Sequence, residues 1–163
     1  MSGLSGDIAS KVVETINNAS LSYQEWSEGV ATYVTTAAPT AEMHWLPYFE
    51  MEEMNVTNIT VVPRQHTSVV KSRTHLEHEV AVDVGIQRRL KRGQKDEDTE
   101  IGWYVALADD IRSLLSHDDF DLSSGEHVSF LGINSETLLA PDHLNEMRQF
   151  THVLTVTYRV INS

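Results

Sequence analysis

Hydrophobic and polar residues alternate over a long segment in the middle of the chain. Across residues 76–90, apolar side chains occupy alternate positions, and most of the positions between them are charged or polar. The apolar positions are Leu76, Val80, Val82, Val84 and Ile86. A period of two predicts a β-strand with one buried face. At about 3.3 Å per residue this strand greatly exceeds the usual length, so we expect its far end to project from the sheet.

Four other segments have the composition of strands. They are rich in β-branched and aromatic residues and cover residues 30–36, 56–63, 127–133 and 151–161. The last of them is apolar or β-branched on nearly both faces, which predicts a central position in the sheet or a helix over one face. Residues 64–72 are polar and predict an exposed, mobile loop. Residues 42–54 have neither period and are interrupted by Pro47, which predicts a loop packed on the core.

Two segments carry apolar residues at helical spacing. Residues 7–19 form the first, with Ser5 or Asp7 available as a cap. Residues 99–116 form the second, and the acidic run before them lies where the helix dipole favours negative charge. Its expected buried stripe is Ile101, Tyr104, Val105, Ala108, Ile111 and Leu115. Together these segments predict two main helices.

The order of these elements predicts the fold class. One helix, three strands, a second helix and two strands follow each other without a repeat or a regular strand–helix alternation. This order favours an α+β fold, a two-layer sandwich with a mixed or mainly antiparallel sheet of about five strands. The 163 residues are enough for a single domain, 1–163, with one core.

Composition excludes several kinds of chemistry. The chain has no cysteine, so it has no disulfide, thiolate nucleophile or cysteine-ligated metal, which fits a reducing compartment. No run of apolar residues is long enough to span a membrane and no export signal begins the chain, so we expect a soluble, intracellular protein. The formal net charge of -12 repels phosphate backbones, so we expect no specific nucleic-acid binding.

The basic residues are concentrated in one place. Arg88, Arg89, Lys91, Arg92 and Lys95 come close together and are followed at once by an acidic run. Because they follow the long alternating strand, we expect them on a hairpin-like tip or arm that meets acidic or polar surface on a partner. The alternative is a solvated loop that only keeps the protein soluble.

Motifs for catalysis and ligand binding are missing from the sequence. It has no Gly-rich phosphate loop, no nucleophile elbow and no His-Glu-x-x-His stretch. His75 and His78 are metal-ligand residue types, but in a strand they point to opposite faces and cannot close on one ion. Residues 119–130 begin like a calcium loop, yet Phe130 stands where a bidentate Glu is needed, so a solvated turn is the better interpretation. We therefore expect no catalytic residues, no metal and no cofactor.

The C-terminal third resembles a known group of proteins. Residues 138–160, LLAPDHLNEMRQFTHVLTVTYRV, resemble the ending of small head–tail joining proteins of tailed bacteriophages, in the tail-terminator or tail-completion group. Residues 61–64 and 82–89 and the helix after them agree with this resemblance. It implies a virion protein without catalytic residues, in which identical subunits, often six, form a ring that caps the tail tube protein and joins it to the head connector. Leu139, Pro141 and Leu144 would then belong to an interface.

Two alternatives to a tail terminator remain open at this point. The chain could be another neck or head-completion ring protein. It could also be a monomeric cytoplasmic protein-binding module that presents a sheet edge or the aromatic segment 45–49 to a partner.

Overall fold

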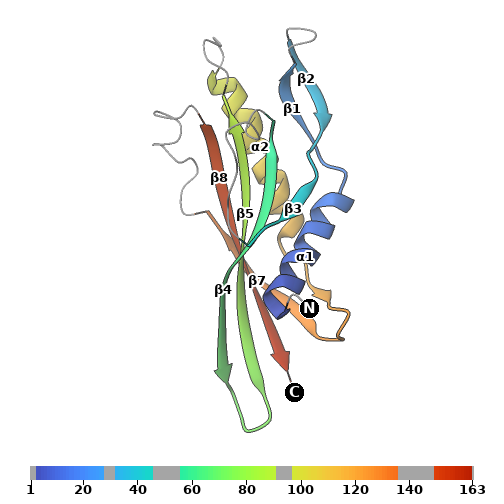
Figure 1. Cartoon of the computed structure of the whole chain (residues 1–163), viewed down its shortest axis with the longest axis vertical. Helices are drawn as coiled ribbons and strands as arrows, with labels where there is room; N and C mark the ends of the chain where they lie inside the picture. Colours follow the sequence, from blue (N-terminus) through green and yellow to red (C-terminus); the bar gives the residue numbers. More distant parts are fainter. Residues whose placement is uncertain (1–2, 28–31, 46–55, 91–96, 136–148, 163) are drawn as a thin grey trace.

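A computed structural model describes residues 3–27, 32–45, 56–90, 97–135 and 149–162 of the chain (Figure 1). In chain order the elements are α1 (Gly3–Asn18), β1 (Ser22–Ser27), β2 (Thr32–Ala37), β3 (Ala41–Met43), β4 (Asn58–Val70), β5 (Leu76–Arg89), α2 (Glu97–Leu115), β6 (Phe120–Asp121), β7 (His127–Asn134) and β8 (Gln149–Asn162). No helix among these residues is long and apolar enough to cross a membrane.

The strands form one large sheet and one hairpin. The large sheet has six strands in the order β3-β4-β5-β8-β7-β6, and β1 and β2 form a separate two-stranded sheet. β3 runs parallel to β4, whereas the other neighbours are antiparallel. The expected α+β class with a mixed sheet is confirmed, while the main sheet has six strands where the sequence predicted about five.

The alternating segment is a strand, as the sequence predicted, but its end at Arg88 and Arg89 does not project from the sheet, because both residues pair with β8. In β5 the side chains of Val80, Val82, Val84 and Ile86 are fully buried. β4 pairs with one side of β5 along its length, and β8 pairs with the other. The predicted central position of β8 is also confirmed, because β8 lies between β5 and β7.

The buried face of the large sheet packs against the two helices. α1 contacts β4 and β5, and α2 contacts β8 and the β1–β2 hairpin. The buried apolar residues of the sheet and both helices form one cluster. Both predicted helices are confirmed, but α1 begins at Gly3, so Ser5 and Asp7 lie inside the helix and do not cap it.

One loop prediction is wrong. Residues 64–70 continue β4 after a bulge between Pro63 and Gln65, and they pair with β5 as far as Val70 opposite Leu76. Their side chains are exposed on both faces of the strand, so burial imposes no apolar–polar alternation on the sequence. Backbone pairing with β5 is what makes this segment a strand.

The sequence predicted only one of the two strands of the N-terminal hairpin. β2 corresponds to the expected strand at residues 30–36, although residues 28–31 lie outside the described part of the chain. Its partner β1 was missed, because Ser, Gln and Glu separate its aromatic residues. Most of the expected 42–54 loop also lies outside the described residues, while Ala41–Met43 forms the short strand β3.

Candidate interaction surface

The first residue of the predicted basic arm points into the protein. Arg88 has the same parity in β5 as Val84 and Ile86, so its side chain faces the core and is buried. The expectation that Arg88 projects towards a partner is therefore wrong. The next residue, Arg89, lies on the opposite face of the sheet and is half-buried.

Arg88 is held by a set of polar and aromatic side chains. Its Nη1 atom donates to Oε2 of Glu25 at 2.8 Å and to Oγ1 of Thr57 at 3.2 Å. Its guanidinium also lies over the ring of Tyr104, 5.8 Å from the centroid. A buried guanidinium is tolerated only with such partners. This cluster therefore fixes β1 and α2 to the end of β5.

Two tyrosines of this cluster stay neutral over a wide pH range. Burial, together with the hydrogen bond that its hydroxyl donates to Glu25, raises the pKa of Tyr23 to about 12. Burial also raises the pKa of Tyr104, whose hydroxyl donates to Oε1 of Glu100 at 2.7 Å. Both hydroxyls act as hydrogen-bond donors to carboxylates, which is a stabilising role.

The face of β4, β5 and β8 that lies away from the helices carries a polar network. Thr155 Oγ1 accepts a hydrogen bond from Arg64 Nη1 at 3.1 Å and donates one to Asp83 Oδ1 at 2.7 Å. The same Arg64 atom lies 3.7 Å from Asp83 Oδ1. One side chain from each of three neighbouring strands is thus linked across the sheet.

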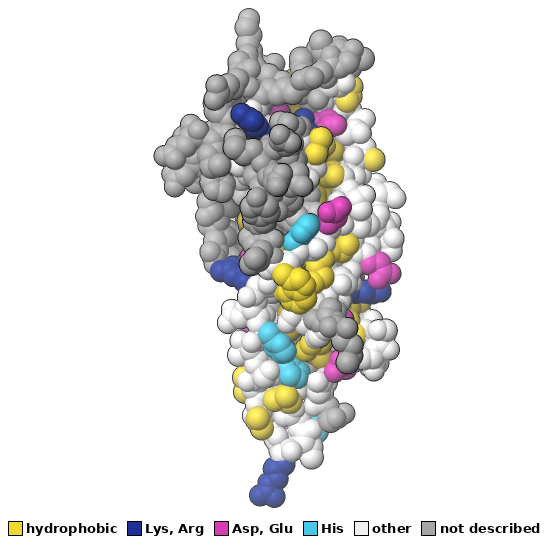
Figure 2. All heavy atoms as spheres, in the orientation of Figure 1, with side chains coloured by type: hydrophobic (Ala, Val, Ile, Leu, Met, Phe, Trp, Pro, Cys, Tyr) yellow, Lys and Arg dark blue, Asp and Glu magenta, His cyan; other side chains and the backbone are white. Residues whose placement is uncertain are grey.

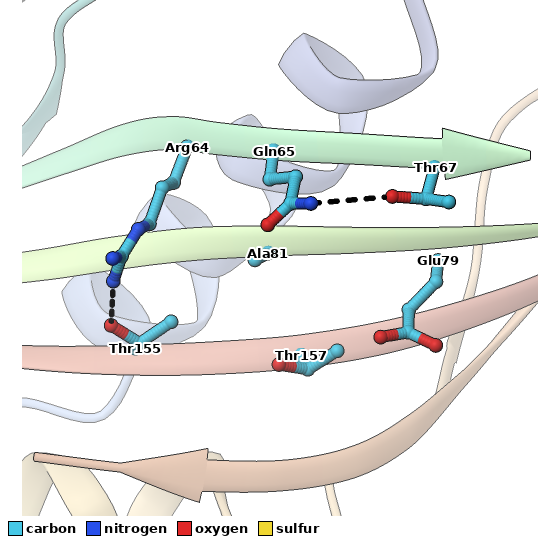
Figure 3. A pocket seen from close by; sticks show the side chains of 7 residues that line it. All are labelled: Arg64, Gln65, Thr67, Glu79, Ala81, Thr155 and Thr157. Atoms are coloured by element: carbon cyan, nitrogen blue, oxygen red, sulfur yellow. Dashed lines mark hydrogen bonds between the residues drawn. The ribbon is translucent and has the colours of Figure 1, made fainter.

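A shallow pocket of about 220 Å³ lies on this face (Figure 3). Its lining comes from the same three strands and consists of Arg64, Gln65, Thr67, Glu79, Ala81, Thr155 and Thr157. Arg64 and Thr155 lie towards one end and Glu79 and Thr67 towards the other, with Thr157 between them. Separated charges and hydroxyls on an open sheet face suit contacts to polar groups of another protein chain.

The far end of the large sheet exposes several apolar side chains. β4, β5 and β8 run past α1 and α2 to the β4–β5 turn (Figure 1), and yellow hydrophobic surface appears near this end in Figure 2. Val69, Val70 and Ile161 have exposed fractions of 49%, 73% and 56%. Val69 and Ile161 flank Glu77 in register on one face of three strands, whereas Val70 lies opposite Leu76 on the other face. Exposed apolar side chains grouped in this way mark interaction surfaces.

Both edges of the large sheet have long stretches without a described partner strand. β3 pairs with β4 only at residues 59–61, and within the described residues nothing pairs with that edge of β4 from Val62 to Val70. On the opposite edge, β6 pairs with β7 only at His127 and Val128. Such edges present backbone N–H and C=O groups to another chain.

Known proteins give no further indication of function. No protein-family model matches the chain, and no curated protein matches it either. In the described parts of the chain, no group of three or more His, Asp or Glu side chains is placed to hold a metal ion. The surface of the sheet and the sequence resemblance are therefore the features that bear on function.

The other residues of the predicted interface lie outside the described part of the chain. They are Lys91, Arg92 and Lys95 of the basic cluster, and Leu139, Pro141 and Leu144 of the C-terminal segment. The sequence does not point to Val69, Val70 or the polar pocket, because it predicts a loop over residues 64–72. The register of β4 against β5 places Val69 on the same face of the sheet as the polar pocket, while Val70 lies on the opposite face.

Proposed function

We propose that this chain is a structural virion protein, a tail terminator whose identical subunits form a ring that caps the tail tube and joins it to the head connector. The resemblance of residues 138–160 supports the choice of tail terminator. The observation that carries an assembly role is the exposed apolar end of β4, β5 and β8. Each subunit would be a two-layer sandwich of two helices and a sheet. It would be located in the tail or neck of the virion.

A ring of this kind requires two different surfaces on each subunit. Head-to-tail contacts between copies are heterologous, so one patch must fit a second patch elsewhere on the same molecule. The β4 edge and the β7 edge lie on opposite sides of the β5–β8 pair and differ in sequence. The exposed side chains of Val69 and Ile161 on one face of the sheet, and of Val70 on the other, add area that loses contact with water when a neighbouring subunit covers it.

The charge of the chain supports a passive role towards DNA. With a net charge of -12 the ring repels phosphate, so the genome would pass through its lumen without binding. The specific partners would be other copies of this chain, the tail tube protein and a head connector or neck protein. A DNA affinity that survives physiological salt would contradict this part of the proposal.

The proposal is tested by solution mass and by electron microscopy of the purified chain. We expect rings in negative stain and a mass that is a multiple of 18.3 kDa. The paired variant Val69→Asp, Ile161→Asp should reduce assembly, because each charge would have to be desolvated in the contact. The matched control is Val56→Asp, another exposed valine outside the strands, which should leave assembly unchanged.

A monomeric protein-binding module is the second candidate, and it is favoured specifically by the edge of β4, which no described strand covers from Val62 to Val70. An extended segment of a partner could add to this edge as a further strand. A chain that stays monomeric at all concentrations, alone and with tail tube protein, would replace the ring proposal with this one. Another neck or head-completion ring would form rings but bind a different virion partner.

A further inference from the structure

Two histidines from neighbouring strands meet on the exposed part of the β4–β5 hairpin. His66 lies on β4 and His78 on β5, and their atoms Nε2 and Nδ1 are 2.9 Å apart. The hydroxyl of Ser68 completes the group, with Oγ 2.9 Å from His78 Nδ1 and 3.4 Å from His66 Nε2. Three atoms with lone pairs therefore form a compact triangle on the surface.

The size of this triangle matches the spacing of ligands around one metal ion. Imidazole nitrogens bind such ions at about 2.0–2.1 Å, so two nitrogens 2.9 Å apart subtend about 90° at the ion. The Ser68 oxygen makes a similar angle with His78 and a wider one with His66. An angle near 90° between adjacent ligands is that of square-planar and octahedral sites.

The strands hold these residues in place before any ion arrives. Ser68 stands directly opposite His78, and His66 stands opposite Val80, which is fully buried. β5 is paired on its other side with β8, so the positions of His78 and Val80 are fixed by two neighbours. Ligands that are already ordered lose little conformational entropy on binding.

We propose that His66, His78 and Ser68 form a surface site for a divalent transition-metal ion of the Cu²⁺ or Ni²⁺ type. The two imidazole nitrogens are the principal ligands, the hydroxyl is a third, and water fills the remaining positions. When the rings are neutral, a hydrogen bond between the two facing nitrogens requires one of them to carry a proton and the other to accept. Moving that proton to the far nitrogen of its own ring frees both lone pairs without changing the charge of either ring.

The ligand set argues for this class of ion over the common alternatives. Mg²⁺ and Ca²⁺ require oxygen ligands, whereas this site has two nitrogens. Zn²⁺ prefers tetrahedral angles, which would place the two nitrogens about 3.3 Å apart. Imidazole with tetragonal geometry is typical of Cu²⁺ and Ni²⁺, and Cu²⁺ has the highest intrinsic affinity in the series.

The test is a titration of the full chain, without an affinity tag, with Cu²⁺ and then Ni²⁺ in a weakly coordinating buffer. Calorimetry should show one equivalent bound, and electron paramagnetic resonance of the Cu²⁺ form should show two nitrogen ligands. His66→Ala and His78→Ala should each weaken binding by at least about tenfold, since even residues that only orient a metal ligand cost that much. Ser68→Ala should cause a smaller loss.

His75→Ala provides the matched control. His75 lies on the same hairpin but bonds to Ser72 and Thr74, so its loss should leave the affinity unchanged. Far-ultraviolet circular dichroism of the variants without metal should match the wild type, because the side chains of His66 and Ser68 are exposed. Equal affinity in wild type, His66→Ala and His78→Ala would reject the site and leave a hydrogen-bonded histidine pair only.

Discussion

Arg88 and Glu25 form an ion pair in which the two partners differ in burial. Nη1 of Arg88 lies 2.8 Å from Oε2 of Glu25, and the exposed fractions of the side chains are 6% for Arg88 and 27% for Glu25. Water can therefore hydrate the carboxylate if the pair is broken, but it reaches the guanidinium far less. The pair joins β1 to the end of β5, so its loss affects the attachment of the whole β1–β2 hairpin.

Removing Glu25 should cost more stability than removing Arg88. Glu25→Ala leaves a buried cation without its counter-ion, which costs about 3 kcal/mol or more. Arg88→Met leaves a carboxylate that water and Tyr23 still solvate, so we expect a loss of only about 1–2 kcal/mol. Urea unfolding of both variants measures the difference. An equal loss in the two variants would show that the difference in burial does not govern the energetics of this pair.

The burial of Arg88 depends on a contact that no local sequence pattern reveals. The alternation of β5 was correctly predicted, and by parity Arg88 belongs to the buried set with Val84 and Ile86. The sequence nevertheless predicts an exposed arm from Arg88 onwards, because the basic cluster comes at the end of the long strand, and a charged residue is rarely buried without a partner. That partner, Glu25, lies 63 positions earlier on a strand that the sequence did not predict.

The lack of a local sequence pattern also explains why the sequence predicts a loop at the far half of β4. The helices and the central strands have one buried face, and burial leaves a period in the sequence. The far half of β4 has no buried face, so only its pairing with β5 defines it as a strand. The contact of His66 with His78 depends on that pairing, and no local pattern in the sequence could reveal it.

Alkaline pH should destabilise the protein before its buried tyrosines ionise in the folded state. Burial raises the pKa of Tyr23 from 10.0 to about 12, and burial also raises the pKa values of Tyr104 and Tyr158. Between about pH 10 and 12 the unfolded chain therefore binds fewer protons than the folded one. The stabilising contribution is complete below pH 10 and is lost as the pH rises towards 12.

Urea unfolding from pH 8 to 11.5 and tyrosinate absorbance at 295 nm measure this effect. The urea midpoint should fall above pH 10, and part of the absorbance change should appear only when the chain unfolds. Tyr23→Phe should reduce the fall, because one of the shifted groups is then absent. Complete ionisation of all tyrosines near pH 10 in the folded protein would contradict the prediction.

The turn between β6 and β7 should require glycine at one position. Gly125 has a φ of +91°, and an added Cβ would meet nothing within 4 Å. Gly125→Ala should therefore cost about 1–2 kcal/mol through backbone strain alone. Gly132 in β7 has equally open surroundings without a positive φ, so Gly132→Ala should change stability by less than about 0.5 kcal/mol. Equal effects of the two substitutions on the urea midpoint would exclude backbone strain as the cause.

The burial of Arg88 reduces the number of residues in the basic cluster that a partner could contact. Because Glu25 neutralises Arg88 inside the protein, the residues of the cluster left for a partner are Arg89, Lys91, Arg92 and Lys95. Replacing Arg89, Lys91 and Arg92 together by Glu should weaken ring assembly without the loss of stability expected at Arg88. The difference in assembly between the triple variant and the wild type should be greatest at low salt, because added salt screens the attraction between charges. The screening length is about 10 Å at 0.1 M salt and becomes shorter as more salt is added. Sedimentation at low and high salt measures both effects, and wild-type assembly of the triple variant at low salt would assign the cluster to solvated surface.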